Sequence, residues 1–230
     1  MITYLSIGGR DTLDFGVRIS GENTFESPRR SVEEVSVPGR SGNLILDNGC
    51  FENIEVKYPA FIAEDFKENM RAFRNFLSSL RGYQRLEDTY HPEYYRMACF
   101  SDALSPKMLP LNVAGTFDLV FNCKPQRWLK TGEEKKADIS SIYNPTLFNA
   151  KPMIRLYGTG ALVIGDYTLV VDNLYPKAYI DIDCDLMNAY WEGTNYNRYV
   201  SGAFPELVPG DNAISWAGSS FEIIPRWWEV

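Results

Sequence analysis

The clearest local signal in the chain is ALVIGDYTLVV, residues 161–171. Two apolar runs meet at the dipeptide Gly165-Asp166, and a glycine followed by a small polar residue is typical of the two-residue turn of a β-hairpin. The stretch therefore predicts two antiparallel strands joined by a tight turn.

The sequence around this hairpin also favours strands. In AYIDIDCD, residues 178–185, apolar residues alternate with aspartates, which predicts a strand with one apolar and one solvent-facing side. The closing residues 204–230 have the same period, with Ile214 and Trp216 on one face, followed by a second apolar face made of Phe221, Ile223, Pro225 and Trp227. Short strands separated by turns such as PGDN indicate a β-sandwich. We expect Trp216 and Trp227 in its core and Trp228 at a contact surface.

The first half of the chain combines strands with one helix. Residues 54–58 and 113–123 alternate between apolar and polar side chains, as strands with one wet face do. Residues 65–82, DFKENMRAFRNFLSSLRG, have an apolar stripe at helical spacing, made of Phe66, Met70, Phe73, Leu77 and Leu80. Asp65 and Glu68 predict a capping box, and Gly82 predicts the stop. The fold class is therefore mainly β.

A composition change suggests where the chain divides. Residues 124–152 are charged and polar, carry three prolines and have no sustained periodicity. We expect an N-terminal domain over residues 1–130, a linker or arm over 131–152 and a C-terminal β-sandwich over 153–230.

Charge and composition exclude several classes of function. The chain has 230 residues and a net charge of −7, which argues against sequence-independent binding to the phosphates of duplex nucleic acid. The four cysteines include no CxxC pair, so a zinc cluster or a disulfide framework is not indicated. We find no secretory signal and no apolar run near the ~20 residues that span a bilayer, so we expect synthesis in the cytoplasm without membrane insertion.

The sequence offers little for catalysis. The single histidine, His91, precedes a proline and has no recognisable nucleophile beside it. The motifs GxSxG, HExxH and the P-loop do not occur. We therefore expect no enzymatic activity and no cofactor.

Two groups of side chains are candidate binding sites. Asp181, Asp183, Asp185 and Glu192 have calcium-loop spacing, but Leu186 stands where the sharp turn requires glycine, so a metal is only weakly indicated. The aromatic residues form the second group, a candidate contact or sugar surface, namely Tyr190, Trp191, Tyr196 and Trp228. Aromatic residues among asparagines suit a sugar pocket and also a protein interface, and composition favours an interface or core.

Several fragments, taken in order, resemble the distal tail proteins of long, non-contractile-tailed bacteriophages (siphophages) and their prophages. In the first half these are a helix between two segments, SVPGRSGNLILDNGCFENIEV at 36–56 and YQRLEDTYHPEYYRMA at 83–98. In the second half they are NPTLFNAKPMIRLYGTG at 144–160, the stretch 185–190, YVSGAFPELVPGDNAISW at 199–216 and EIIPRWW at 222–228. The resemblance extends over the whole chain.

This resemblance implies a fold and a role in the virion. Such proteins have a ring-forming N-terminal belt domain with α+β structure and a C-terminal galectin-like or carbohydrate-module-like β-sandwich. The implied assembly is a homohexameric ring at the tail tip, made in the bacterial host cytoplasm. Its implied partners are the tail-tube protein, the tail-associated fibre or hub protein, the tape-measure protein and a receptor-binding protein, with DNA passing through the channel.

The resemblance also leads to expectations about individual residues. We expect the belt strands near residues 31–61 to form the ring interface, with Arg40 close to a neighbouring subunit or the lumen and with Ile54, Val56 and Tyr58 among the contacts. The alternative function is a carbohydrate-binding adhesion module that recognises a host cell-wall polysaccharide.

Overall fold

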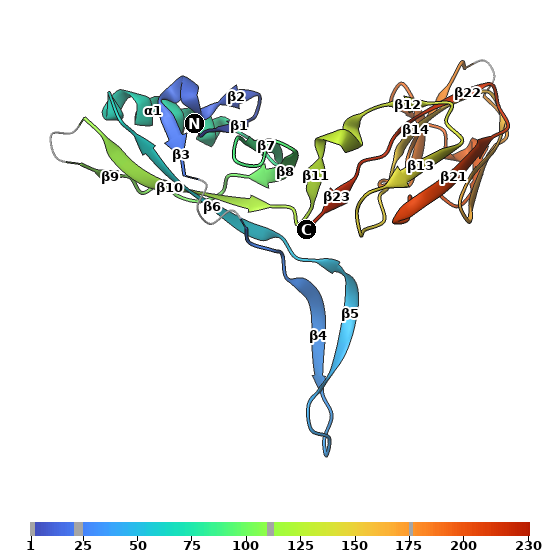
Figure 1. The fold of residues 1–230 in the computed structure, drawn as a ribbon, viewed down its shortest axis with the longest axis horizontal. Coiled ribbons are helices and arrows are strands. Elements are labelled where there is room, and N and C mark those ends of the chain that lie inside the picture. The colour runs from blue at the N-terminus through green and yellow to red at the C-terminus, as the bar shows by residue number, and fades with distance from the viewer. Residues whose placement is uncertain (1–2, 21–24, 110–112, 175–176) are drawn as a thin grey trace. The chain divides into compact units, whose positions relative to one another are not determined.

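The computed structural model describes residues 3–20, 25–109, 113–174 and 177–230 (Figure 1). The chain divides into two compact units, Met1–Arg127 together with Val230, and Trp128–Glu229. Both units are built mainly from strands, so the predicted fold class is confirmed. Within the described residues, no helix is long and apolar enough to cross a membrane.

The first unit is built on an antiparallel sheet with the strand order β2-β1-β7-β8-β10-β6-β3. Its strands are β1 (Leu5–Ile7), β2 (Arg10–Asp11), β3 (Val17–Ile19), β6 (Ile54–Ile62), β7 (Gln84–Asp88), β8 (Tyr94–Cys99) and β10 (Gly115–Cys123), with β9 (Lys107–Met108) beside β10 and the 3-10 helix η1 (Thr12–Phe15) before β3. The two predicted alternating segments form β6 and β10, which pair from Gly115↔Ile62 to Cys123↔Ile54. Val113, the first apolar residue of the predicted segment 113–123, is 52% exposed because it lies before β10 begins.

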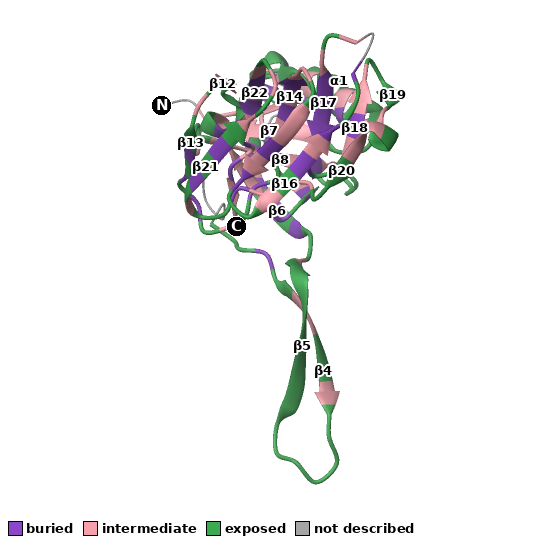
Figure 2. Cartoon of the chain, turned by 90° about the vertical axis from the view of Figure 1, so that its right-hand side faces the viewer, coloured by how far each residue is buried: buried purple, intermediate pink, exposed green. Residues whose placement is uncertain are grey.

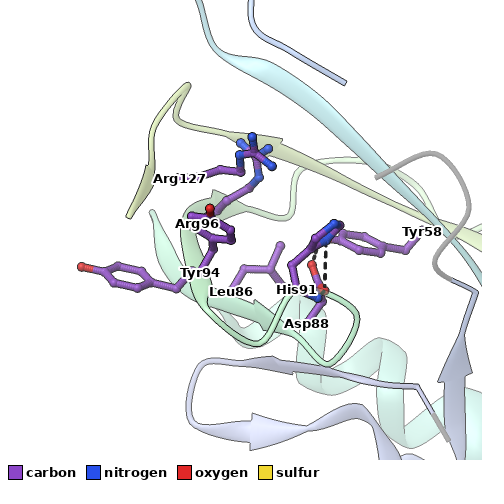
Figure 3. Close-up of a pocket in the computed structure, with 8 residues that line it drawn as sticks. Tyr58, Leu86, Asp88, His91, Tyr94, Arg96 and Arg127 are labelled. Carbon is purple, nitrogen blue, oxygen red and sulfur yellow. Dashed lines mark hydrogen bonds and ion pairs between the residues drawn. The ribbon is translucent and has the colours of Figure 1, made fainter. Parts of the chain in front are cut away.

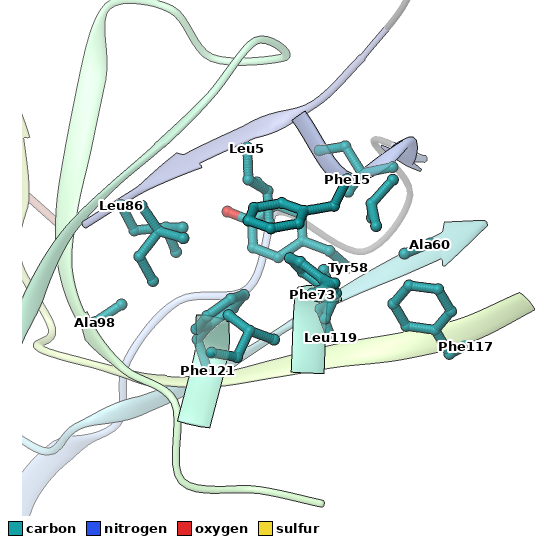
Figure 4. Close-up of a cluster of buried hydrophobic side chains, with 14 of the residues drawn as sticks. Leu5, Phe15, Tyr58, Ala60, Phe73, Leu86, Ala98, Phe117, Leu119 and Phe121 are labelled. Atoms are coloured by element: carbon teal, nitrogen blue, oxygen red, sulfur yellow. The ribbon is translucent and has the colours of Figure 1, made fainter. Parts of the chain in front are cut away.

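The core of this unit lies between the sheet and the helix α1 (Phe66–Ser79). Phe73 is fully buried, and its ring centroid lies 5.5 Å from that of Phe15 and 6.1 Å from that of Phe117 (Figure 4). Four residues of the predicted stripe are buried, and Leu80 packs partly buried against the same core. The helix and its buried face are therefore confirmed.

Both predicted end signals of this helix are wrong. Asp65 has a left-handed backbone (φ 49°) and makes no side-chain cap, because a capping side chain requires the extended backbone of an ordinary N-cap. Its carbonyl oxygen instead accepts the N–H groups of Glu68 and Asn69, each at 3.1 Å. The helix ends at Ser79, before Gly82, because Leu80 turns into an extended conformation and packs on the core.

The second unit is a sandwich of two sheets with one core between them. One sheet has the order β12 (Lys136–Ala137), β22 (Ser220–Ile224), β14 (Met153–Tyr157), β17 (Ile180–Asp183), β18 (Asn188–Trp191) and β19 (Thr194–Asn195). The other has the order β13 (Ser141–Asn144), β21 (Gly210–Trp216), β15 (Gly160–Ile164), β16 (Tyr167–Val171) and β20 (Val200–Gly202). Shorter elements are β11 (Arg127–Leu129), which pairs with β23 (Trp228–Glu229), and the 3-10 helices η3 (Lys130–Glu133) and η4 (Asn197–Tyr199).

The predicted hairpin and the predicted core positions of Trp216 and Trp227 are confirmed. β15 and β16 form the hairpin around Gly165 (φ 53°), with Ile164 opposite Tyr167. Trp227 is 4% exposed, and Trp216 packs partly buried against the same core. The Trp216 Nε1–H donates to the carbonyl oxygen of Tyr157 at 3.2 Å, which ties β21 to β14 in the opposite sheet.

Residues 131–152, expected to be a linker, instead add strands to the sandwich. β12 pairs with β22, and β13 pairs with β21. Both strands lie at sheet edges, and the side chains that β13 buries are those of Ile142 and Asn144. The buried Asn144 amide donates to the carbonyl oxygens of Phe148 and Leu207, both at 2.9 Å. A short edge strand that buries an asparagine lacks the apolar alternation by which strands are recognised.

Candidate functional site

The most unusual surface of the first unit is a hairpin that we call the arm, residues 30–51. Its strands β4 (Arg30–Ser36) and β5 (Asn43–Phe51) form a separate sheet and, within the described part of the chain, pair only with each other. Figure 2 shows the arm as a long ribbon with almost no buried residue. An isolated two-stranded hairpin is at best marginally stable in water, so the arm needs a further surface to pack against.

Apolar side chains on the arm are exposed to solvent. Leu44, Ile45 and Leu46 are 43%, 54% and 45% exposed. Because Val35 pairs with Leu44 and strand residues alternate between faces, Val35, Leu44 and Leu46 lie on one side, which we call the apolar face of the arm. Contiguous exposed apolar residues of this kind mark interaction surfaces.

Polar contacts along the arm fix its pairing. Arg30 Nη1 lies 2.6 Å from Asp47 Oδ2, and the Asn43 amide donates to Glu34 Oε2 at 2.8 Å. These groups are exposed to solvent, and exposed ion pairs typically contribute about 0–1 kcal/mol. They set the register of the arm but do not replace a hydrophobic core.

The tip of the arm carries Arg40, one of the residues expected at the ring interface. The chain turns between Ser36 and Asn43, with Gly39 and Gly42 in the left-handed region (φ 79° and 84°). The backbone N–H of Arg40 donates to the carbonyl oxygen of Val37 at 3.1 Å, and the residue is exposed. Arg40 is therefore accessible to a neighbouring molecule.

The other three residues expected at this interface are buried inside their own unit. Ile54, Val56 and Tyr58 are 8%, 2% and 2% exposed and face the core from β6. This corrects the expectation, because side chains packed in one chain's core offer no surface to a second copy. Leu44 and Leu46 lie within the expected range 31–61 but were not named individually, although the run LIL in NLILDN was a signal that could have singled them out.

The aspartates of β17 are also buried, contrary to the predicted solvent-facing side. Asp181 is 6% exposed and is held by Arg155, with Nε to Oδ1 at 2.7 Å and Nη2 to Oδ2 at 3.0 Å. Asp183 is 7% exposed and makes a bidentate pair with Arg226, with Nη1 to Oδ1 at 2.9 Å and Nη2 to Oδ2 at 3.0 Å. Paired guanidinium groups make it feasible to bury carboxylates in a sheet.

These ion pairs also bear on the candidate metal site. The carboxylates of Asp181 and Asp183 face arginines, Asp185 is exposed with its Oδ1 3.7 Å from Lys151 Nζ, and Glu192 is exposed. Across the described ranges, no group of three or more metal-ligating side chains is found. The four carboxylates with calcium-loop spacing are therefore not gathered around one point in the described structure.

The Asp183–Arg226 pair predicts how the second unit responds to acid. Burial alone raises the pKa of Asp183, but hydrogen bonds from Arg226 and from the N–H groups of Leu186 and Asp185 outweigh burial and lower it. A lowered pKa contributes stability above the unfolded value of about 3.9, and this stability is lost as the pH falls through the folded value. We expect the second unit to weaken below about pH 4.

The variant Asp183→Asn tests this prediction. At neutral pH it should cost about 2 kcal/mol, less than a fully buried pair because Arg226 is 32% exposed. Urea unfolding at a series of pH values measures both effects, and Asp185→Asn is the control because that carboxylate is exposed. An acid response equally steep in wild type and Asp183→Asn would contradict the role of this pair.

The candidate aromatic surface is only partly assembled. Tyr190 and Trp191 lie on β18, and Tyr196 follows β19, the strand paired with it, with its ring centroid 5.4 Å from that of Tyr199. The Nζ of Lys177 lies 3.4 Å from the ring centroid of Trp191 and covers one of its faces. Trp228 makes separate contacts, stacking on Phe148 at 4.5 Å and donating its Nε1–H to the carbonyl oxygen of Asn149.

Comparison with known proteins relates this architecture to phage tails. The sequence matches no family model and no curated protein. Among solved structures, SPP1 Dit (gp 19.1), a paradigm of the hub adsorption apparatus in phages that infect Gram-positive bacteria, is similar with a TM-score of 0.80 and 13% identity, over 100% of both chains. A chain of the phage p2 baseplate in its activated conformation is similar with a TM-score of 0.52 and 13% identity, over 97% of this chain and 98% of that one. These likenesses confirm, at the level of the fold, the resemblance found in the sequence.

Proposed function

We propose that this chain is a structural hub protein at the distal end of a siphophage tail, where copies of it close into a ring of six. The observation that carries the proposal is the arm, whose Leu44 and Leu46 are exposed and, among the described residues, lie outside the hydrophobic core. Support for the phage-tail setting comes from the whole-chain likeness to SPP1 Dit.

A ring is the assembly that such an arm favours. The arm of one copy and the surface that it contacts on the next copy are different patches, so the contact is heterologous. Such a contact repeats from copy to copy until the ring closes. Burying a leucine side chain contributes about 1.5–3 kcal/mol, so the apolar face of the arm can supply a large part of each contact. In a closed ring every arm packs against a neighbouring copy, so the apolar face of each arm is buried.

The ring's task is to connect other parts of the tail. One side would receive the tail-tube protein and the other the fibre or hub protein, with receptor-binding proteins attached, while the tape-measure protein and DNA pass through the centre. This role needs no catalytic residue and no cofactor. The alternative of a carbohydrate-binding module has weaker support, because Lys177 already covers one face of Trp191.

The direct test is the oligomeric state of the purified full chain. We expect light scattering to give a mass near six times the 26.2 kDa of the chain, and negative-stain images to show a ring with a central pore. A monomer at every protein concentration, in the presence or absence of sugar, would contradict the proposal.

Charge reversal at the tip of the arm tests the position of Arg40. We expect Arg40→Glu to weaken association about two- to fivefold, as for an exposed charge at the rim of an interface. Arg71→Glu, on the exposed side of α1, is the matched control and should associate like the wild type. Sedimentation velocity over a concentration series measures the difference, and equal association of both variants would remove Arg40 from the interface.

A further inference from the structure

The first unit has a groove on the side of its sheet that faces away from α1. Phe61 on β6, Thr116 on β10 and Lys107 on β9 lie side by side on paired strands. All three residues are exposed, whereas the neighbouring Phe117 is buried in the core. The groove that they line has a volume of about 350 Å³. A cavity of about 150 Å³ already accepts a benzene ring, so the groove can take about two leucine-sized side chains.

The groove also carries positive charge. Lys107 makes no ion pair with any described residue, and neither does Arg18, which lies opposite Phe61 on β3. The carboxylate of Asp118 in the same groove is already paired with Lys57, at 2.8 Å. A partner that fits this groove should therefore combine apolar side chains with a negative charge.

The apolar face of the arm has this combination. Glu33 pairs with Leu46 across the two strands, so its carboxylate lies on the same face as Val35, Leu44 and Leu46. Glu33 is exposed and, within the described part of the chain, makes no ion pair. An apolar face with one free carboxylate complements a groove that offers an exposed phenylalanine and a free lysine.

Two other cavities of the first unit fit the arm less well. The cavity between β6 and β8 has a volume of only about 20 Å³, which holds one water-sized group, and Figure 3 shows polar side chains around it. The groove at the start of α1 is larger, about 490 Å³. Its charges cancel, however, because two acidic and two basic side chains line it, namely Asp65, Lys67, Glu68 and Arg71.

We propose that the groove around Phe61 receives the arm of a second copy, with Leu46 against Phe61 and Glu33 beside Lys107. This inference rests on the proposed ring, and it names the surface that each copy offers to the arm of its neighbour. The contact joins two different patches, as a closed ring requires. The apolar side chains supply the burial, and the pairing of Glu33 with Lys107 opposes a shift of the arm along the groove.

Charge exchange tests this pairing in solution. Glu33→Lys and Lys107→Glu each place like charges together, so each should weaken association about tenfold in sedimentation velocity. The double variant restores opposite charges and should associate within about threefold of the wild type. Glu33→Lys combined with Arg71→Glu has the same net charge, is the matched control and should not restore association. Failure of the double variant to recover, when the wild type forms a ring, would overturn the proposal.

A cysteine cross-link tests the contact itself. Because Cys50 on the arm is exposed, the experiment uses a Cys50→Ser background. Leu46→Cys together with Phe61→Cys should form disulfides between copies under mild oxidation and give a ladder of covalent oligomers on a non-reducing gel. Ile45→Cys together with Phe61→Cys is the matched control and should give little or no ladder, because Ile45 lies on the opposite side of the arm.

The cross-link also separates this contact from the ring itself. A ring in electron micrographs without a ladder would overturn the proposed contact and leave the ring standing. A disulfide within a single chain would show that the arm folds onto the groove of its own copy, which would also overturn the proposal. A wild type that stays monomeric at every concentration would overturn the ring and the contact together.

Discussion

The variant Leu46→Lys is expected to purify as a monomer under conditions in which the wild type forms a ring. Leu46 is 45% exposed in the single chain and lies on the apolar face of the arm. A lysine there removes about 1.5–3 kcal/mol of apolar burial at each contact and places a charge in the interface. Association should weaken at least about tenfold at each contact, and light scattering against protein concentration measures the loss.

Lysine is chosen so that the arm itself stays folded. Leu46 pairs directly with Glu33 on β4, and opposite charges across a strand pair are mildly stabilising. The unfolding temperature of the single chain should change by less than about 2 °C, because the leucine is not part of a core. Ser36→Lys is the matched control, because it adds the same charge on the opposite side of the arm. Loss of the ring in both variants would indicate a general charge effect and count against the apolar face.

The sequence was most informative where burial follows a simple period. The hairpin around Gly165, the stripe of α1 and the closing strands with Trp227 each expose one face to water and bury the other. A period of 2 or 3.6 in the apolar residues is then enough to recognise the element and its core side. The hairpin was predicted from its turn residues, and α1 and the closing strands were predicted with the correct faces.

Prediction failed where a tertiary partner changes the meaning of a residue. The alternation around Asp181 and Asp183 predicts that both side chains face solvent. Both are buried instead, because each pairs with an arginine that is distant in the sequence. Val56 reads as a strand residue with an apolar face, but alternation alone cannot say whether that face meets the core or another copy. The apolar residues of the arm are the opposite case, because an apolar run in a sequence suggests burial, and only the fold shows that Leu44, Ile45 and Leu46 are exposed.

Phe73→Ala is expected to have the largest effect on stability of any single change considered for this chain. Phe73 is fully buried in the centre of the first core, where it contacts Phe15 and Phe117. Truncating a buried phenylalanine to alanine costs about 3–5 kcal/mol, because the cavity left behind is only partly filled by relaxation. For a unit of this size the unfolding temperature should fall by about 10 °C or more.

The same variant tests whether the two units are independent domains that meet near residue 130. The buried residues of the two cores form two separate clusters with no member in common, and Phe73 belongs to the first. Calorimetry should therefore show one transition shifted and the other, from the sandwich, unchanged. Phe61→Ala is the matched control, because Phe61 is 39% exposed on β6 and should shift the first transition by only about 2 °C. If Phe73→Ala lowers both transitions together, the units unfold as one body and the proposed division into domains is wrong.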